Sequence, residues 1–362
     1  MESKIYLKEN FFVEKKTPVL QTGTLSASLF TYDTGVKAVR LQNEKGYLIM
    51  LPFMGQMIWR MNFLGKELTM KSIHDQPLPA KEVFGETYGC FMMHCGLSAM
   101  GNPTAADTHL PHGELPVAKY DEAYLVSGED KEGKYIGLGG KFSFKRCFEH
   151  DYDFCPLVKL YEGETSIKIS VTFTNHRILP LEYFYLCHVN HRPVDGAKLV
   201  YTADPKKIVV HHEVPDGYYP EWAAKTNAYL NALDKDPSIM NEVGANGQFY
   251  APEIVFNCTY TADEEGKAYT MQVNPDGTAT YVVHRPDQLP FGVRWIARTG
   301  DEEAMGMVLP ATAEHKGYLY CKEHGYEKYL PQNESVTYNI ETGILTVEDA
   351  KKMQDKIKKM GF

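Results

Sequence analysis

The sequence predicts an all-β fold in which antiparallel strands form a sandwich or a barrel, with few short helices. From Ser166 to Thr174 every second residue is apolar, which is typical of a strand that buries one face. Many segments of this kind are separated by turn signals, and strand and helix patterns do not alternate regularly. A doubly wound parallel sheet is therefore not expected.

Three β-hairpins are indicated by strand patterns that flank polar turns containing glycine. Their arms and turns are 36–41 and 47–51 around Gln42–Gly46, 124–126 and 134–138 around Gly128–Gly133, and 269–273 and 278–283 around Asn274–Gly277. Further strands are expected at Tyr183–Pro193 and Phe291–Arg298.

Helical patterns are confined to a few places. Glu221–Leu233 fits a short helix, and Val347–Met360 fits a C-terminal amphipathic helix at about residues 346–362. The long polar segment Pro205–Met240 is interpreted as an excursion over the sandwich, since no linker, repeat or low-complexity run marks a domain boundary. We therefore expect a single β-sandwich domain over residues 1–362.

The charge of the chain argues against a nucleic-acid partner. Its 362 residues carry a formal net charge of −9 at pH 7, whereas a nucleic-acid binder would show a basic face. No run of about 18 apolar residues and no signal-peptide pattern is present, so no membrane contact is expected. The seven cysteines are scattered and form no CxxC pair, which indicates reduced thiols in a cytoplasmic protein.

The densest group of chemically active residues runs from His94 to Glu114 and also contains His109 and His112. Its glycines and prolines favour a site-forming loop over the interior of a strand. A lone loop histidine is more often a surface residue. Because two other histidines and a glutamate lie close by, we expect His112 to belong to a functional site.

A second group lies in Tyr183–Pro193. In a strand, His188 and Asn190 point to one face, and His191 comes at the end of the segment. A buried imidazole must be hydrogen-bonded or functional, because leaving it unpaired costs about 1–3 kcal/mol. A satisfied core histidine is the alternative interpretation of His188.

A third group lies in Phe291–Arg298, where Arg294 and Trp295 are neighbours and so point to opposite faces of a strand. An arginine or an aromatic ring beside a groove suits the hydroxyls or the apolar face of a sugar, although either can be purely structural. Arg60, Arg294 and Arg298 hint at an acidic or phosphorylated substrate.

The histidines and Glu114 also raise the possibility of a metal site. Three ligands and an open position could come from the set His94, His112, Glu114, His188 and His191. The spacing argues against it, because the chain has no HxH, HExxH or CxxC motif, and strand residues three apart face different ways. No metal and no cofactor are therefore expected. Neither a GxSxG nucleophile motif nor a glycine-rich phosphate loop is present.

Several short motifs, taken in their order along the chain, resemble the aldose 1-epimerase (galactose mutarotase) family in a divergent branch. They span about residues 20–345 and comprise Gly46–Trp59, Asn62–Glu67, Cys95–Leu97 with the later His112-Gly113, Val171–Asn175, Leu186–Asn190, Tyr329–Pro331 and Thr337–Gly343. The resemblance implies a galactose mutarotase-like supersandwich of antiparallel strands, with a carbohydrate groove on one concave sheet.

The resemblance also implies roles for two histidines. By position, His112 looks like the histidine that holds and polarises the sugar ring oxygen in that family. His188 looks like the strand histidine that acts as general acid on the same oxygen. Ring opening needs a proton at the ring oxygen while one leaves the anomeric hydroxyl, so an acid and a base must flank that end of the sugar.

The chain departs from the family at the base. The family places a glutamate directly before a proline near the C-terminal end, where this chain has Leu309. A leucine accepts no proton. The base then comes from elsewhere, with Glu314 the nearest candidate and Asp287 or Glu303 behind it, or the protein does not perform ordinary mutarotation.

The leading hypothesis is an aldose 1-epimerase-like isomerase that acts on a small-molecule sugar, with His112, His188 and Glu314 as catalytic residues. The expected substrate contacts are Arg60, His94, Glu114, Asn190 and Arg294. Two alternatives stay open: another sugar isomerisation or an elimination on the same fold, including a metal-assisted one, or a sugar-binding protein without catalysis. A homodimer is also left open.

Overall fold

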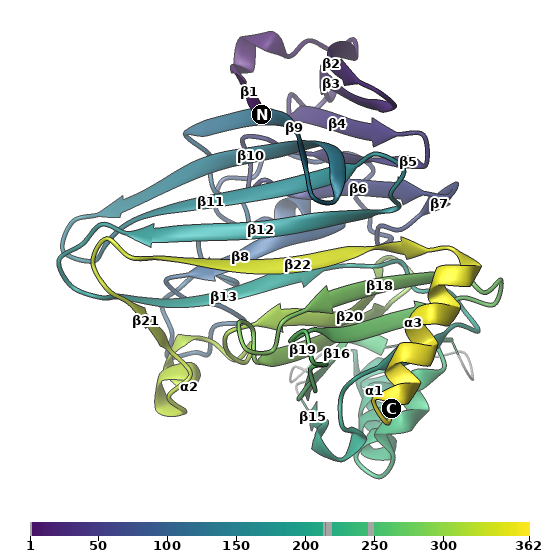
Figure 1. Ribbon diagram of the computed structural model, residues 1–362. Helices are drawn as coiled ribbons and strands as arrows, with labels where there is room; N and C mark the ends of the chain where they lie inside the picture. Colours follow the sequence, from purple (N-terminus) through teal and green to yellow (C-terminus); the bar gives the residue numbers. More distant parts are fainter. Residues whose placement is uncertain (1, 213, 215–218, 245–249) are drawn as a thin grey trace.

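Two antiparallel β-sheets stack face to face and form a sandwich (Figure 1). The structure is a computed structural model that describes residues 2–212, 214, 219–244 and 250–362. Neighbouring strands of both sheets pair in antiparallel register. The predicted all-β fold of antiparallel strands is confirmed.

The first sheet has nine strands in the described part of the chain. In spatial order they are β1 (Ser3–Tyr6), β9 (Glu122–Asp130), β10 (Gly133–Arg146), β11 (His150–Tyr161), β12 (Ser166–Asn175), β22 (Ser335–Leu345), β18 (Ala279–His284), β17 (Ala268–Val273) and β14 (Lys198–Tyr201).

The second sheet has thirteen strands in the same described residues. In spatial order they are β15 (Val209–His211), β16 (Tyr250–Cys258), β19 (Phe291–Arg298), β20 (Glu303–Ala311), β13 (Leu181–Val189), β8 (Met92–Leu97), β6 (Ile58–Phe63), β5 (Gly46–Met50), β4 (Lys37–Asn43), β3 (Leu25–Thr31) and β2 (Thr17–Thr22), with β21 (Lys328–Leu330) paired to β13 and β7 (Lys66–Glu67) paired to β6.

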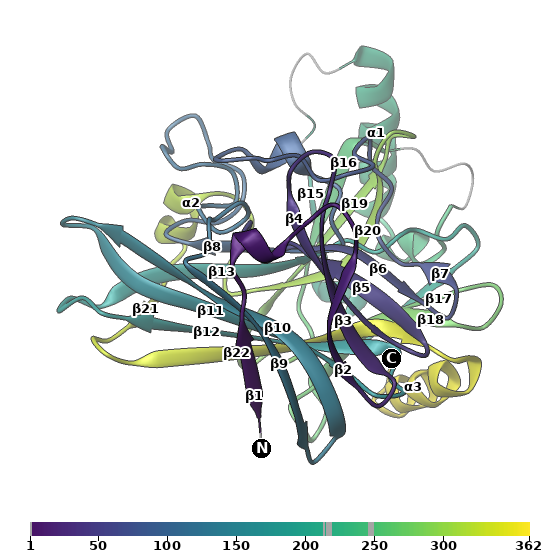
Figure 2. The same ribbon diagram turned by 90° about the horizontal axis from the view of Figure 1, so that it is seen from above.

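The helices lie on opposite outer sides of the sandwich. Figure 2 shows α1 (Pro220–Leu233) and α2 (Tyr318–Glu323) on the outer side of the second sheet, and α3 (Val347–Lys359) on the outer side of the first. Short 3-10 turns are η1 (Glu9–Phe11), η2 (Phe84–Thr87), η3 (Pro205–Lys207) and η4 (Pro237–Asn241). Residues 213 and 215–218 of the polar excursion lie outside the described residues.

The main hydrophobic core fills the space between the two sheets, and β12 shows how the sequence builds it. The side chains of Ile167, Ile169, Val171 and Phe173 are at most 1% exposed and join this core. Residues that alternate with them, such as Thr172, are partly exposed. The one-sided burial predicted from the alternation is confirmed.

Two of the three predicted hairpins have tighter turns than expected. β9 and β10 pair from Gly128 opposite Tyr135 to Asp130 opposite Gly133, so Gly128 is a strand residue rather than part of the turn. β4 and β5 likewise pair as far as Asn43 opposite Gly46. Polar residues in these arms have the composition of a loop, but their backbones continue the ladder to the end of the hairpin.

The expectation of a loop starting at His94 is corrected. Residues Met92–Leu97 form strand β8, which pairs with β13 and places His94 opposite Cys187. All six residues of β8 are buried, so the strand has no polar face that alternation could reveal. The loop that reaches the outer side of the second sheet begins only at Ser98.

A second apolar cluster covers the outer face of the second sheet. It includes Met93, Cys95, Leu186, Val293 and Leu309. The central strands β8, β13, β19 and β20 of the second sheet are therefore buried on both faces, and the outer cluster surrounds the pocket described below. All seven cysteines are free thiols. Of the helices in the described chain, none has the length and apolar character needed to span a membrane.

Phe173 tests the importance of the core between the sheets. Its ring is fully buried and lies against Phe154, Tyr183 and Tyr338. We expect Phe173→Ala to lower the free energy of unfolding by about 3–5 kcal/mol, because it leaves a cavity. The matched control is Phe148→Ala, which removes a ring that is 97% exposed and should change the value by no more than about 0.5 kcal/mol. Urea denaturation measures both, and equal effects would contradict this account of the core.

Candidate active site

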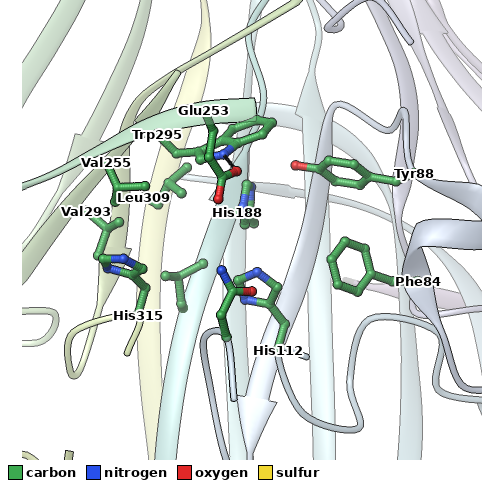
Figure 3. Close-up of a pocket in the computed structure, with 12 residues that line it drawn as sticks. Phe84, Tyr88, His112, His188, Glu253, Val255, Val293, Trp295, Leu309 and His315 are labelled. Carbon is green, nitrogen blue, oxygen red and sulfur yellow. Dashed lines mark hydrogen bonds between the residues drawn. The ribbon is translucent and has the colours of Figure 1, made fainter. Parts of the chain in front are cut away.

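A pocket opens on the outer face of the second sheet and brings together residues far apart in the sequence (Figure 3). About 500 Å³ of space not filled by atoms lies in the pocket and in its solvent-open mouth together. Its lining residues are Phe84, Tyr88, Asn102, His112, Leu186, His188, Glu253, Val255, Val293, Trp295, Leu309 and His315. Two of the three predicted catalytic residues, His112 and His188, therefore share one pocket.

His188 is held in one tautomer by its neighbour on the same face. Its Nδ1 lies 2.7 Å from Oδ1 of Asn190, and Nδ2 of Asn190 donates to the backbone oxygen of Cys90 at 3.1 Å. Because Nδ2 is used as a donor, Oδ1 accepts, so Nδ1 of His188 carries the proton. The other ring nitrogen, Nε2, is then a hydrogen-bond acceptor when the imidazole is neutral.

Burial lowers the pKa of His188 to about 4, with a smaller lowering from the nearby His315, while the hydrogen bond to Asn190 opposes the change. The imidazole of His188 is therefore neutral at physiological pH. This state differs from the protonated acid that the family resemblance implies, because a buried strand on a two-sided sheet disfavours the charged form.

His112 is placed by an unusual backbone. Its φ of 62° is in the left-handed region, and its backbone N–H donates to Gly101 O at 2.9 Å. The next residue, Gly113, approaches the start of the loop so closely that a Cβ there would lie 2.3 Å from Ala99 O. The loop thus holds the His112 ring 5.4 Å from the His188 ring, centroid to centroid. Burial, and then the neighbouring His188 and His315, hold the pKa of His112 well below its usual range.

Aromatic rings surround the two histidines. Trp295 lies 5.2 Å from His188, Tyr88 lies 6.0 Å from it, and Phe84 lies 5.3 Å from His112, all between ring centroids. Figure 3 shows Phe84 and Tyr88 on one side of the histidines. Such rings offer flat apolar surfaces on which a ligand can stack.

Glu253 is a pocket residue that the sequence analysis missed. It lies on β16, accepts a hydrogen bond from Nε1 of Trp295, and directs its carboxylate toward the pocket (Figure 3). Val255, two residues later on the same face, pairs across the sheet with Trp295. The sequence offers no local sign of this role beyond one carboxylate in the mainly apolar segment Tyr250–Cys258, because the tryptophan that binds it lies on another strand.

Four aliphatic side chains form what we call the aliphatic wall of the pocket: Leu186, Val255, Val293 and Leu309. They come from the adjacent strands β13, β16, β19 and β20, and Val293 pairs directly with Leu309. The residue at the family's glutamate position thus faces the pocket, but it contributes an apolar surface.

Arg294, expected as a substrate contact, lies away from the pocket. It lies on the face of β19 opposite Trp295, fully buried between the sheets. Its Nε donates to Met307 O at 2.8 Å, and its guanidinium lies 4.2 Å from the centroid of the Tyr201 ring. The sequence analysis placed Arg294 and Trp295 on opposite faces, and the pocket is on the tryptophan side.

Arg60 donates hydrogen bonds to the backbone of the segment that carries two pocket aromatics, and it does not itself line the pocket. Its Nη1 donates to Gly89 O at 2.6 Å and its Nη2 donates to His74 O at 3.0 Å. The segment between these two residues carries Phe84 and Tyr88. Arg60, expected as a substrate contact, therefore binds the backbone of this segment and is not among the lining residues.

His94 and Glu114 also lie behind the pocket. His94 faces the core between the sheets, where Nδ1 is 2.9 Å from the Tyr185 hydroxyl. Glu114 accepts from the backbone N–H groups of Leu97 and Ser98 at 3.1 and 2.9 Å, which ties the two ends of the His112 loop together. Asn190 supports His188 rather than lining the pocket.

None of the carboxylates expected as the base lines the pocket. Glu314 directs Oε1 to the Tyr326 hydroxyl at 3.3 Å, and its Oε2 lies 4.0 Å from Nε2 of His211. Asp287 and Glu303 pair with Arg285 and Arg298, respectively. In place of Glu314, the next residue in the chain, His315, faces the pocket.

The five residues weighed as metal ligands do not converge. His112 and His188 face the pocket, while His94 and Glu114 lie on the other side of the second sheet or along the loop, and His191 lies against Thr342 at 3.2 Å. Within the described ranges, no three His, Cys, Asp or Glu side chains gather into a set that could hold a metal ion.

The sequence matches the family model described as a domain of unknown function, DUF4432, over residues 33–344. The chain belongs to the DUF4432 family. A comparison of this DUF4432 sequence with curated proteins found no match.

Solved structures show which fold this DUF4432 chain adopts. A Klebsiella pneumoniae protein described as a candidate aldose 1-epimerase is similar with a TM-score of 0.80 at 16% identity, over 99% of this chain and 96% of that one. A galactose mutarotase-like protein from Clostridium acetobutylicum has a TM-score of 0.54 at 13% identity, over 89% of this chain and 98% of that one. These likenesses confirm the predicted galactose mutarotase-like supersandwich and the predicted resemblance.

The hydrogen bond between His188 and Asn190 can be tested by replacing the side-chain NH2 group of Asn190 with an oxygen. We expect Asn190→Asp to raise the pKa of His188 from about 4 by about one to three pH units, because a carboxylate beside Nδ1 stabilises the imidazolium. NMR titration of the histidine ring signals measures the pKa. Asn339→Asp, on an exposed part of β22, is the matched control and should leave His188 unchanged. An unchanged pKa in Asn190→Asp would show that the two side chains are not bonded in solution.

Proposed function

We propose that this DUF4432 chain is an enzyme that interconverts the anomers of a free sugar, as an aldose 1-epimerase does. The observation that carries the proposal is the convergence of His112 and His188 in one pocket with the carboxylate of Glu253. The Klebsiella relative, which has the same fold and is described as a candidate aldose 1-epimerase, supports the proposal. The seven free thiols favour a reducing, cytoplasmic location.

The pocket suits an uncharged sugar. Its aromatic side chains offer stacking surfaces for the apolar face of a pyranose, and its histidines, Asn102 and Glu253 offer partners for hydroxyls. None of the described lining residues is a lysine or an arginine. The acidic or phosphorylated substrate suggested by Arg60, Arg294 and Arg298 is therefore replaced by a neutral one, since these arginines lie outside the pocket lining.

Neutral His188 can move the required proton. Nε2 accepts the proton of the anomeric hydroxyl O1 while the bond between C1 and the ring oxygen breaks and the C1=O1 double bond forms. The electron pair of the broken bond stays on the ring oxygen, which then takes the proton from the imidazolium. Closure on the other face of the carbonyl reverses these transfers and inverts C1. A histidine can serve as base and then as acid in this way.

Glu253 and His112 assist this transfer. The carboxylate of Glu253, fixed by Trp295, places a negative charge in the pocket in which the imidazolium forms. Such a charge stabilises the imidazolium most in a pocket of low dielectric. His112, held at its fixed backbone angle, offers a ring nitrogen to the sugar beside His188.

Loss of the proton carrier should abolish catalysis. We expect His188→Gln to lower kcat/KM for anomer exchange by at least about 10²-fold, and Glu253→Gln by about tenfold or more. His176→Gln, which changes a partly exposed histidine paired with Asp153, is the matched control and should retain activity. Polarimetry of a freshly dissolved α-sugar measures the rate. If no sugar equilibrates faster than in buffer but sugars still raise Tm, the protein is a sugar-binding protein without catalysis.

The pH dependence follows from the lowered pKa of His188. The neutral imidazole is the active form, so activity is present above the pKa of about 4 and is lost as the pH falls through it. We expect kcat/KM to stay nearly constant from pH 8 to about 5.5 and to fall about tenfold per pH unit below about 4. Circular dichroism at each pH shows whether the fold persists. If kcat/KM instead declines as the pH rises above about 4, His188 acts as a protonated acid.

A further inference from the structure

We infer that the sugar is a deoxyaldose, in which a hydrogen replaces at least one ring or side-chain hydroxyl. This inference rests on the proposed function, since it names the substrate of the same pocket. The observation behind it is the aliphatic wall, defined above as Leu186, Val255, Val293 and Leu309.

The aliphatic wall is continuous and firmly placed. Its four strands, β16, β19, β20 and β13, are neighbours in the second sheet. The side chains are between 1% and 5% exposed, so they are packed from behind and cannot turn away from a ligand. Leu309 and Val293 face each other across the ladder at one register position. Figure 3 shows Val255, Val293 and Leu309 on the side of His188 that lies across from Phe84 and Tyr88.

This surface discriminates against hydroxyl groups. A sugar bound between the aromatic rings and the aliphatic wall must press one edge against the wall. A hydroxyl at that edge loses its hydrogen bonds to water and finds no partner on an aliphatic side chain. A methyl or methylene group at the same edge instead buries apolar surface.

Most polar groups of the pocket lie apart from the aliphatic wall. Figure 3 shows His188 and Glu253 near Trp295, whereas His315 lies beside Val293. The polar groups can pair with the anomeric hydroxyl, the ring oxygen and further hydroxyls. A hydroxyl that meets the four aliphatic side chains themselves finds no partner on them, whereas a deoxyaldose can place a methylene or methyl group there.

The test compares sugars that differ by one oxygen. Glucose is paired with 2-deoxyglucose and with 6-deoxyglucose, and galactose with 2-deoxygalactose and with 6-deoxygalactose. Exchange between the anomeric proton signals in NMR gives kcat/KM for each. We expect at least one deoxy sugar to exceed its parent by about tenfold or more. The two arms show whether the position beside C1 or the position at C6 meets the wall.

Variants of the wall link the preference to its cause. Leu309→Asn should lower the ratio of deoxy to parent sugar by about tenfold or more, because it gives the wall a hydrogen-bonding partner. Val293→Thr has almost the same shape and should lower the ratio in the same direction, which guards against misfolding of the first variant. Leu309→Met, which keeps an apolar side chain, is the matched control and should retain the ratio.

The outcomes separate the two proposals. If all four pairs react with ratios within about threefold of one, the deoxyaldose inference is overturned while the proposed function stands. If no sugar reacts, the proposed function fails, and the rise in Tm that each sugar produces at equal concentration still decides the preference. A larger rise for a deoxy sugar than for its parent, lost in Leu309→Asn, supports the wall, and equal or smaller rises overturn it.

Discussion

Burial of the central strands of the second sheet on both faces is the constraint on which the rest of the structure depends. One face of these strands packs against the first sheet through the main core, and the other carries the apolar cluster around the pocket. Central strands in this position have no solvent-facing side, so polar side chains within them need partners from the protein. The polar pocket residues His188 and Glu253 each have such a partner, in Asn190 and in Trp295.

The same constraint shapes the chemistry of the polar residues in this sheet. His188 obtains a partner from Asn190, and Arg294 obtains partners from Met307 O and from the Tyr201 ring. Removal from water favours neutral imidazole, so in the proposed reaction His188 starts as an acceptor of protons. A carboxylate in the pocket, that of Glu253, accepts a hydrogen bond from the indole N–H of Trp295.

The constraint also explains what could be predicted from the sequence. In the first sheet, one-sided burial gives the alternation seen at Ser166–Thr174, so strands such as β12 were predictable. In the second sheet, a strand buried on both faces shows no alternation, so the start of the predicted loop, His94–Leu97, is instead part of strand β8. His112 and His188 could be singled out because their segments are rich in functional groups. Glu253 could not, because its partner Trp295 lies 42 positions away and only the strand register joins them.

The tie between Gly113 and the backbone at Gly96 and Ala99 has a consequence for how such a protein diversifies. The position of His112 is set by contacts between main-chain atoms, which amino-acid replacements elsewhere in the pocket leave intact. The aliphatic wall and the aromatic rings around the histidines, in contrast, are made of side chains only. Exchange of wall residues one at a time can therefore change the ligand of this pocket, while the loop keeps the His112 ring beside His188. Backbone closure of the loop thus separates the inheritance of a mechanism from the evolution of its specificity.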